Sequence, residues 1–269
     1  MDRCAEIRKS IVNMMHYSKS SHIGSCLSIV ELLYVLYFKV LRINPEEPAY
    51  PERDRFILSK AHASAALYAV LAERGFFPKE YLDKYYIDGG LLPGHLDREA
   101  VPGVEVSAGS LGHGLSLGVG MAMVNQKDKN PGRIFVLLGD GECNEGSVWE
   151  AVMLASTHRL KNITAIVDFN GLQGLGYTKD IIKQDNLGER WRAFGWEVLQ
   201  IDGHNLRAIE KALNATQNGP KVIIANTIKG KGVSFMENCL EWHYKSPDSA
   251  QLKNAVKEIE ERCNEEDIY

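Results

Sequence analysis

The sequence predicts an α/β fold, an open and mostly parallel sheet with helices on both faces. From residue 134 onward, short apolar runs alternate with helix-like segments, which is typical of parallel strands joined by crossover helices. The run at 134–138 is continuously apolar, as expected for a strand that is covered on both faces. The predicted strands are 134–138, 163–168, 196–201 and 221–226, and the predicted helices between them are 147–159, 187–194 and 205–217.

The chain begins with helical segments. Apolar residues recur at helical spacing over 2–19 and predict an amphipathic first helix, which is ended by the segment 20–24. Ser28 and Glu31 have the spacing of a capping box, so we expect them to open a second, largely buried helix. Three prolines between residues 45 and 51 then mark a loop.

The middle of the chain contains a long irregular stretch. Residues 87–110 are glycine-rich and lack any periodicity, and an irregular stretch of this length in a compact domain is usually functional. The other elements predicted here are a buried strand at 56–58, an Ala-rich helix ending at Gly75, a short helix from Pro78, a helix from about His113 and a final helix at 249–262.

Composition and charge exclude several classes of protein. The 269 residues are 45% hydrophobic and 25% charged, with no repeat or linker, so residues 1–269 are expected to form a single domain. A net charge of −4 without a basic patch argues against binding nucleic acid. The five cysteines lack metal-ligand spacing and are expected to be free thiols of a soluble cytoplasmic protein. The most apolar segment, 27–41, contains two charges; it is too short to span a membrane and begins too late for a signal peptide.

Asp140 and Asn170 are the main candidates for a metal site. Asp140 lies between two glycines directly after one predicted strand, and Asn170 follows the next strand along the chain. Because ligands bind at the carboxyl ends of parallel strands, we expect the two side chains to reach the same point. A carboxylate, an amide oxygen and a nearby carbonyl suit Mg²⁺, which completes its octahedron with phosphate and water. The alternative is an ordinary turn in which Asp140 is a capping residue.

The glycines at 112–118 indicate an anion site. Gly112, Gly114 and Gly118 invite a dinucleotide-binding interpretation, but they miss the required spacing and follow no clear strand. We expect instead that backbone N–H groups and a helix N-terminus face an anion here, a role that would serve a diphosphate.

Four histidines give the second functional signal. His22, His62, His95 and His243 each lie at a break between predicted elements around the sheet, and none has the spacing of a zinc motif. Imidazoles that exchange protons near neutral pH suit a reaction at sugar hydroxyls and carbonyls. For any one of them alone, the alternative is a solvated or capping histidine.

Taken together, these segments resemble the transketolases. They occur in the order seen in that family, from about residue 5 to 245, and correspond to its N-terminal, diphosphate-binding domain only. The chain therefore resembles the N-terminal subunit of a split transketolase, whose pyrimidine-binding half is another polypeptide. The motifs are SSHIG (20–24), RDRFILSKAH (53–62), LPGH (92–95), GSLGHGLS (109–116), GDGECNEG (139–146), DFNG (168–171), KGKG (229–232) and EWH (241–243).

The resemblance implies a transferase with a thiamine diphosphate-binding fold, using thiamine diphosphate and Mg²⁺. The implied reaction moves a two-carbon ketol unit from a ketose phosphate to an aldose phosphate, in carbohydrate metabolism of the pentose phosphate type. The residues implied are Asp140, Asn170 and the Leu172 carbonyl for the metal; His22, His62, His95 and His243 for catalysis; and His62, Gly109, Ser110, Leu111, Gly141, Glu145, Asn170, Lys229 and His243 for the cofactor.

The resemblance also implies a partner. The glutamate that activates the aminopyrimidine and the arginines that bind substrate phosphate belong to domains absent here, so activity is expected only in an α₂β₂ assembly with a C-terminal, pyrimidine-binding subunit. Glu145 and Glu150 match acidic residues near the family's subunit interface, or are simply acids near a helix N-terminus. Lys229 assists at the site or is a solvated loop lysine.

The identity of the sugar stays open at this point. Ile23, Leu96-Asp97 and His113 depart from the residues usual in the family, which leaves substrate preference undecided. Two alternative functions remain: the alpha subunit of a thiamine diphosphate-dependent 2-oxo acid dehydrogenase, and a cofactor-binding partner without turnover. The four histidines argue against the first, and the retained metal-site and histidine residues argue against the second.

Overall fold

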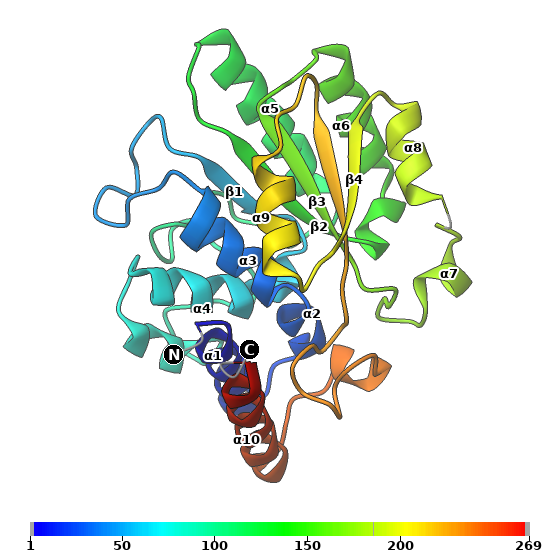
Figure 1. The fold of residues 1–269 in the computed structure, drawn as a ribbon. Coiled ribbons are helices and arrows are strands. Elements are labelled where there is room, and N and C mark those ends of the chain that lie inside the picture. Colours follow the sequence, from blue (N-terminus) through cyan, green and yellow to red (C-terminus); the bar gives the residue numbers. More distant parts are fainter. Residues whose placement is uncertain (1–2, 185, 267–269) are drawn as a thin grey trace.

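The structure confirms the predicted α/β fold. The computed structural model describes residues 3–184 and 186–266. Five parallel strands form one sheet in the order β1-β2-β3-β5-β4 (Figure 1). In this order the two strands that directly precede Asp140 and Asn170 are neighbours. The strands are β1 (Arg55–Leu58), β2 (Ile134–Gly139), β3 (Ile163–Phe169), β4 (Glu197–Asp202) and β5 (Lys221–Asn226).

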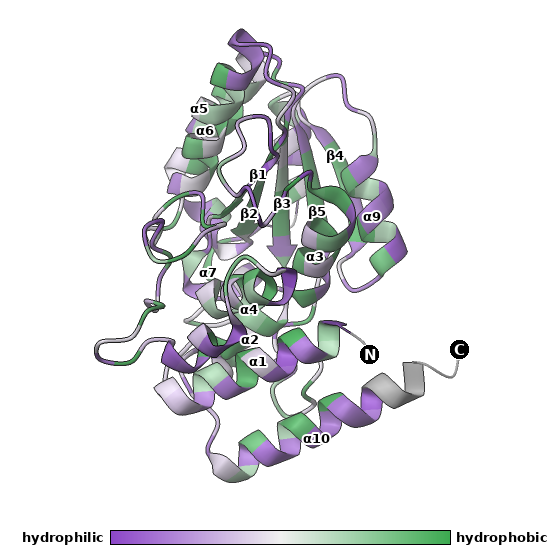
Figure 2. Cartoon of the chain, turned by 90° about the vertical axis from the view of Figure 1, so that its left-hand side faces the viewer, coloured by the Kyte–Doolittle hydropathy of each residue, from purple (hydrophilic) through white to green (hydrophobic). Residues whose placement is uncertain are grey.

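Helices cover both faces of the sheet, as predicted. Along β2, Phe135 and Leu137 join the buried cluster of α3, α4 and α9, whereas Val136 and Leu138 join that of α5, α6 and α8. Helix α10 packs on α1, away from the sheet (Figure 2). The helices are α1 (Arg3–Ser18), α2 (Ile23–Leu27), α3 (Val30–Val35), α4 (Ser64–Arg74), α5 (His113–Lys127), α6 (Gly146–Thr157), α7 (Thr178–Ile181), α8 (Leu187–Ala193), α9 (Leu206–Asn214) and α10 (Ser249–Glu266).

The capping box predicted at Ser28 is wrong. The segment forms two short helices, and α3 begins at Val30 without a side-chain cap. The Ser28 hydroxyl instead donates a hydrogen bond to Asp168 Oδ2 over 2.7 Å, and Glu31 forms an ion pair with Arg8. Both side chains are buried, so partners far along the chain outweigh the local capping pattern.

Most other predicted elements are present. The first helix is α1, although Asp2 lies outside the described residues. Residues 87–110, all of them described, contain no helix or strand.

Cys26, Cys143 and Cys239 have free thiols, while the side chain of Cys263 lies outside the described part. Within 3–184 and 186–266, no helix has both the length and the apolar character needed to cross a membrane.

Candidate active site

A cavity of about 520 Å³ opens at the carboxyl ends of the strands. It brings together every predicted site residue except Ser110, which is exposed outside the lining. Four segments supply most of the lining: the turns after β1, β2 and β3, and the loop after β5. The predicted residues that line it are His22, His62, His95, Gly109, Leu111, Asp140, Gly141, Glu145, Asn170, Leu172, Lys229 and His243.

The oxygen atoms of the predicted metal site converge where β2 and β3 end. The two strands are paired up to Gly139 and Asp168, which puts Asp140 and Asn170 side by side. Asp140 Oδ2 accepts hydrogen bonds from the Gly171 N–H at 2.7 Å and from the Thr178 hydroxyl at 3.1 Å. The turn that permits this contact contains Gly171 at a φ of 75°, in the left-handed region that favours glycine.

These oxygens fit a hard divalent cation. Burial, together with the negative charge of Asp168, raises the pKa of Asp140 to about 6, which a bound cation would offset. No cluster of three or more His, Cys, Asp or Glu side chains capable of holding a metal occurs in the described residues. A metal here would therefore depend on the Asn170 amide, the Leu172 carbonyl and ligand phosphates, a combination that suits Mg²⁺.

The four predicted histidines form one cluster in the cavity. The His22 ring lies 5.0 Å from that of His62, 5.1 Å from that of His243 and 6.5 Å from that of His95, measured between centroids. His22 has a φ of 79°, which is uncommon for a residue other than glycine, and its N–H donates to the His243 carbonyl at 2.8 Å. Strain of this kind is characteristic of residues that a fold holds in place for a function.

Burial keeps three of these imidazoles neutral. Burial, followed by the charge of neighbouring groups, lowers the pKa of His22 to about 4 and that of His243 to about 3. The pKa of His62 is also lowered well below its usual value, mainly by burial. A neutral imidazole can donate at one nitrogen and accept at the other, so the cluster can hydrogen-bond both hydroxyl and carbonyl groups near neutral pH.

Lys229 lines the cavity and is buried, so its interpretation as a solvated loop lysine is wrong. The residue is 1% exposed, and its Nζ donates to the Leu172 carbonyl at 2.9 Å and to His243 Nδ1 at 2.9 Å. Burial, with a contribution from the positive charge of Lys60, lowers the pKa of Lys229 to about 8. The ammonium group therefore lies between the metal-site oxygens and the histidine cluster, where it can bind an anionic ligand.

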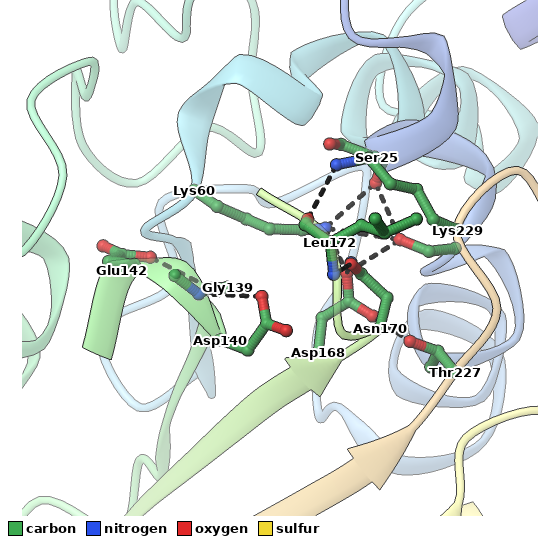
Figure 3. Close-up of polar contacts among 12 residues, drawn as sticks. Ser25, Lys60, Gly139, Asp140, Glu142, Asp168, Asn170, Leu172, Thr227 and Lys229 are labelled. Carbon is green, nitrogen blue, oxygen red and sulfur yellow. Dashed lines mark hydrogen bonds and ion pairs between the residues drawn. The ribbon is translucent and has the colours of Figure 1, made fainter. Parts of the chain in front are cut away.

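Sequence reasoning missed three buried charged residues in or next to the cavity: Lys60, Glu142 and Asp168. Lys60 and Asp168 form an ion pair of 2.5 Å, and Asp168 also contacts Asn170 (Figure 3). Glu142 accepts hydrogen bonds from the N–H groups of Gly112 at 2.9 Å and Gly139 at 3.1 Å. All three lie inside the motifs named above. The sequence signal that could have identified them is a charged residue close to a buried apolar run.

Glu142 also connects the start of α5 to the sheet through Ser59. The Ser59 hydroxyl donates to Glu142 and accepts from the Gly114 N–H at 3.1 Å. A Cβ on Gly114 would lie 2.5 Å from Ser59 Cβ and 2.8 Å from Ser59 Cα. Only glycine therefore allows α5 to approach the turn after β1 this closely.

We expect Gly114→Ala to lower the free energy of unfolding by about 1–3 kcal/mol, because the added methyl group overpacks this contact. Urea denaturation of the full chain measures the change. Gly120→Ala is the matched control on the same helix, since its Cβ would meet no described atom within 4 Å. The control should be neutral or stabilising by up to about 1 kcal/mol, and equal stability of the two variants would contradict the close approach.

Comparison with known proteins agrees with this geometry. Residues 2–261 match the family model of the transketolase thiamine diphosphate binding domain. The chain is 42% identical over 258 residues to an apulose-4-phosphate transketolase subunit of Phocaeicola vulgatus, covering 95% of this chain and 92% of that protein. It is 45% identical over 258 residues to the 6-deoxy-6-sulfo-D-fructose transketolase subunit SqwG of a Clostridium species, covering 94% of each.

Longer transketolases contain the same fold. A crystal structure of transketolase from Campylobacter jejuni superimposes with a TM-score of 0.90 at 32% identity, covering 96% of this chain and 42% of that one. Human transketolase is 37% identical over 260 residues, which are 96% of this chain and 41% of that protein. The chain thus spans about two fifths of these longer proteins. It belongs to the transketolase family, in which it corresponds to the thiamine diphosphate binding domain.

Proposed function

We propose that this chain is the N-terminal subunit of a two-chain transketolase. The observation that carries the proposal is that the metal-site residues, Lys229 and the four histidines all line the same cavity. The relatives named as separate transketolase subunits match this chain over nearly their whole length, which supports a subunit of this size. The proposed reaction moves a two-carbon ketol unit from a ketose phosphate to an aldose phosphate, and the proposed location is the cytoplasm.

In this proposal the floor of the cavity holds the cofactor. Asp140, Asn170 and the Leu172 carbonyl would hold Mg²⁺, and Lys229 would bind the diphosphate. When bound, thiamine diphosphate supplies the nucleophilic carbon and the electron sink for cleavage of the ketose. We further propose that residues 1–269 form one domain, which the match over 2–261 and the single sheet support.

The histidine cluster would bind the sugar and move its protons. The centroids of the neutral rings of His22, His62 and His243 lie between 5.0 and 6.0 Å from one another. A proton taken from a substrate hydroxyl by one ring can therefore be returned to a carbonyl oxygen by the next. A 2-oxo acid needs no such set of donors around a polyhydroxylated chain, which favours the transketolase over the dehydrogenase alternative.

We expect His95→Ala to lower kcat/KM for the ketose phosphate by about 10²–10⁴-fold in the assembled enzyme, the usual contribution of a general acid or base. Thiamine diphosphate affinity should stay nearly unchanged, because His95 is an exposed residue of the 87–110 loop and is not among the residues proposed to hold the metal and the diphosphate. Steady-state kinetics and calorimetry measure the two quantities. His158→Ala, an exposed histidine of the surface, is the control. A loss below about threefold would return His95 to an ordinary loop residue.

Two exposed apolar surfaces support a partner subunit. The first is the rim of the cavity, where Leu175 is 85% exposed and Tyr244 64% exposed. The second, which we call the α5/α6 face, consists of Leu117, Val124, Met153 and Leu154 on two helices that pack side by side (Figure 2). Apolar residues gathered in this way are typical of surfaces that another chain covers. We propose that the pyrimidine-binding subunit covers the rim in an α₂β₂ assembly.

A further inference from the structure

Asp168 is the most highly connected polar side chain beneath the cavity floor. It is 0% exposed, yet it does not belong to the cavity lining. Its Oδ2 accepts from Lys60 Nζ at 2.5 Å, from the Ser28 hydroxyl at 2.7 Å and from Asn170 Nδ2 at 2.8 Å, and its Oδ1 accepts from the Thr227 hydroxyl. These partners come from four separate segments of the chain (Figure 3).

The contact with Asn170 has a directional consequence. An ionised carboxylate only accepts hydrogen bonds, so the side of the Asn170 amide that faces Asp168 has to be the NH₂ group. The amide oxygen is then turned to the opposite side, where it accepts from the Leu172 N–H at 3.0 Å. Leu172 is also the residue whose carbonyl belongs to the candidate metal site.

Lys60 makes this arrangement possible in a buried place. It is 1% exposed, and its Nζ donates to the Ser25 carbonyl at 2.9 Å as well as to Asp168. An unpaired carboxylate at this depth would be strongly unfavourable. With Lys60 in place, Asp168 Oδ2 accepts from Asn170 Nδ2 at 2.8 Å, and this contact fixes the direction of the amide.

We propose that Asp168, paired with Lys60, is a positioning residue that fixes the Asn170 amide with its oxygen toward the metal. The inference rests on the proposed function, in that it takes Asn170 as a ligand of Mg²⁺. It assigns a role to a buried ion pair whose carboxylate, Asp168, lies outside the cavity lining. Partners of this kind, which orient a ligand, typically change metal affinity by about 10–100-fold when they are replaced.

The test is the affinity for Mg²⁺ in the presence of thiamine diphosphate, measured by calorimetry on the full chain, or on its assembly with the partner where the chain alone binds too weakly. Asp168→Asn keeps the shape of the side chain but can present either an NH₂ group or an oxygen to Asn170. We expect it to weaken Mg²⁺ binding by at least about tenfold. Lys60→Met/Asp168→Asn, which leaves no charge unpaired, serves the same purpose if the single variant does not fold.

Asp54→Asn is the matched control. Asp54 is likewise a buried aspartate, 1% exposed, which is paired with Arg42 and Arg133 at the opposite end of β1. Its replacement should lower the free energy of unfolding but leave Mg²⁺ affinity unchanged. If Asp54→Asn weakens Mg²⁺ binding as much as Asp168→Asn does, the loss of affinity results from lost stability. That outcome would overturn the proposal.

The exchanged pair Asp168→Asn/Asn170→Asp separates positioning from mere stabilisation. With Asp at 170, either oxygen can face the metal, and an Asn at 168 can donate to the other. We therefore expect the exchanged pair to recover most of the affinity that Asp168→Asn loses. Unchanged affinity in folded Asp168→Asn, or no recovery in the exchanged pair, would overturn the inference. Absence of binding by the wild-type assembly would instead overturn the proposed function, and the inference with it.

Discussion

Purified alone, the chain should show no ketol transfer from a ketose phosphate to an aldose phosphate, and mixing with its partner subunit should restore transfer. Three carboxylates line the described cavity: Asp140 and Glu142, which accept from backbone N–H groups on its floor, and Glu145, which the family resemblance places near the subunit interface. The carboxylate needed at the aminopyrimidine is expected on the partner. Loss of one such acid–base group typically costs about 10²–10⁴-fold, and an uncovered cavity also admits water.

A coupled spectrophotometric assay measures this difference, with mass spectrometry confirming that the isolated chain carries no partner. Circular dichroism should show that the inactive chain is folded. A mixture of the partner with the Asp140→Ala chain is the matched control, and it should stay inactive. Full turnover by the isolated wild-type chain would overturn the two-chain proposal.

The second large effect is expected at Asp140. Asp140→Ala should abolish Mg²⁺-dependent binding of thiamine diphosphate, a loss of more than about 100-fold, because it removes a direct ligand rather than a partner of one. The carboxylate is also the only charged group among the three proposed ligands, and Mg²⁺ gives up its water reluctantly for neutral oxygens. Calorimetry of the assembled enzyme, or of the chain if it binds alone, measures the loss.

Asp180→Ala is the control for this variant, since it removes an exposed carboxylate from the nearby helix α7. Urea denaturation of both variants should show that they remain folded. Binding of wild-type strength by Asp140→Ala would return Asp140 to the role of a turn residue. It would also contradict the metal site proposed at the carboxyl ends of β2 and β3.

The fold and the position of the site were predictable because they depend on short-range patterns. Continuous apolar runs predicted the buried strands, and the rule that ligands lie at the carboxyl ends of parallel strands placed Asp140 near Asn170. The apolar runs do not depend on which strand lies next to which, whereas the proximity of Asp140 and Asn170 also needs β2 and β3 to be neighbours. The order of the five strands, with β5 between β3 and β4, had no counterpart in the sequence.

The buried polar contacts were not predictable, because they depend on that order. Lys60 and Asp168 are 108 positions apart in the sequence. They meet because β1, β2 and β3 are consecutive parallel strands, so that their carboxyl ends lie at the same edge of the sheet. Ser28 shows the opposite failure: a local pattern predicted a helix cap, but a carboxylate 140 positions away takes its hydroxyl. Buried side chains of this kind reveal their partners only in three dimensions.

The α5/α6 face bears on how the chain is produced in a cell. A surface with Leu117, Val124, Met153 and Leu154 between 44% and 56% exposed invites self-association when its cover is missing. If another subunit covers this face, synthesis of the two has to be balanced, because any surplus of one would aggregate or be degraded. Translation of both from adjacent reading frames would provide that balance and would let the chains meet soon after they leave the ribosome.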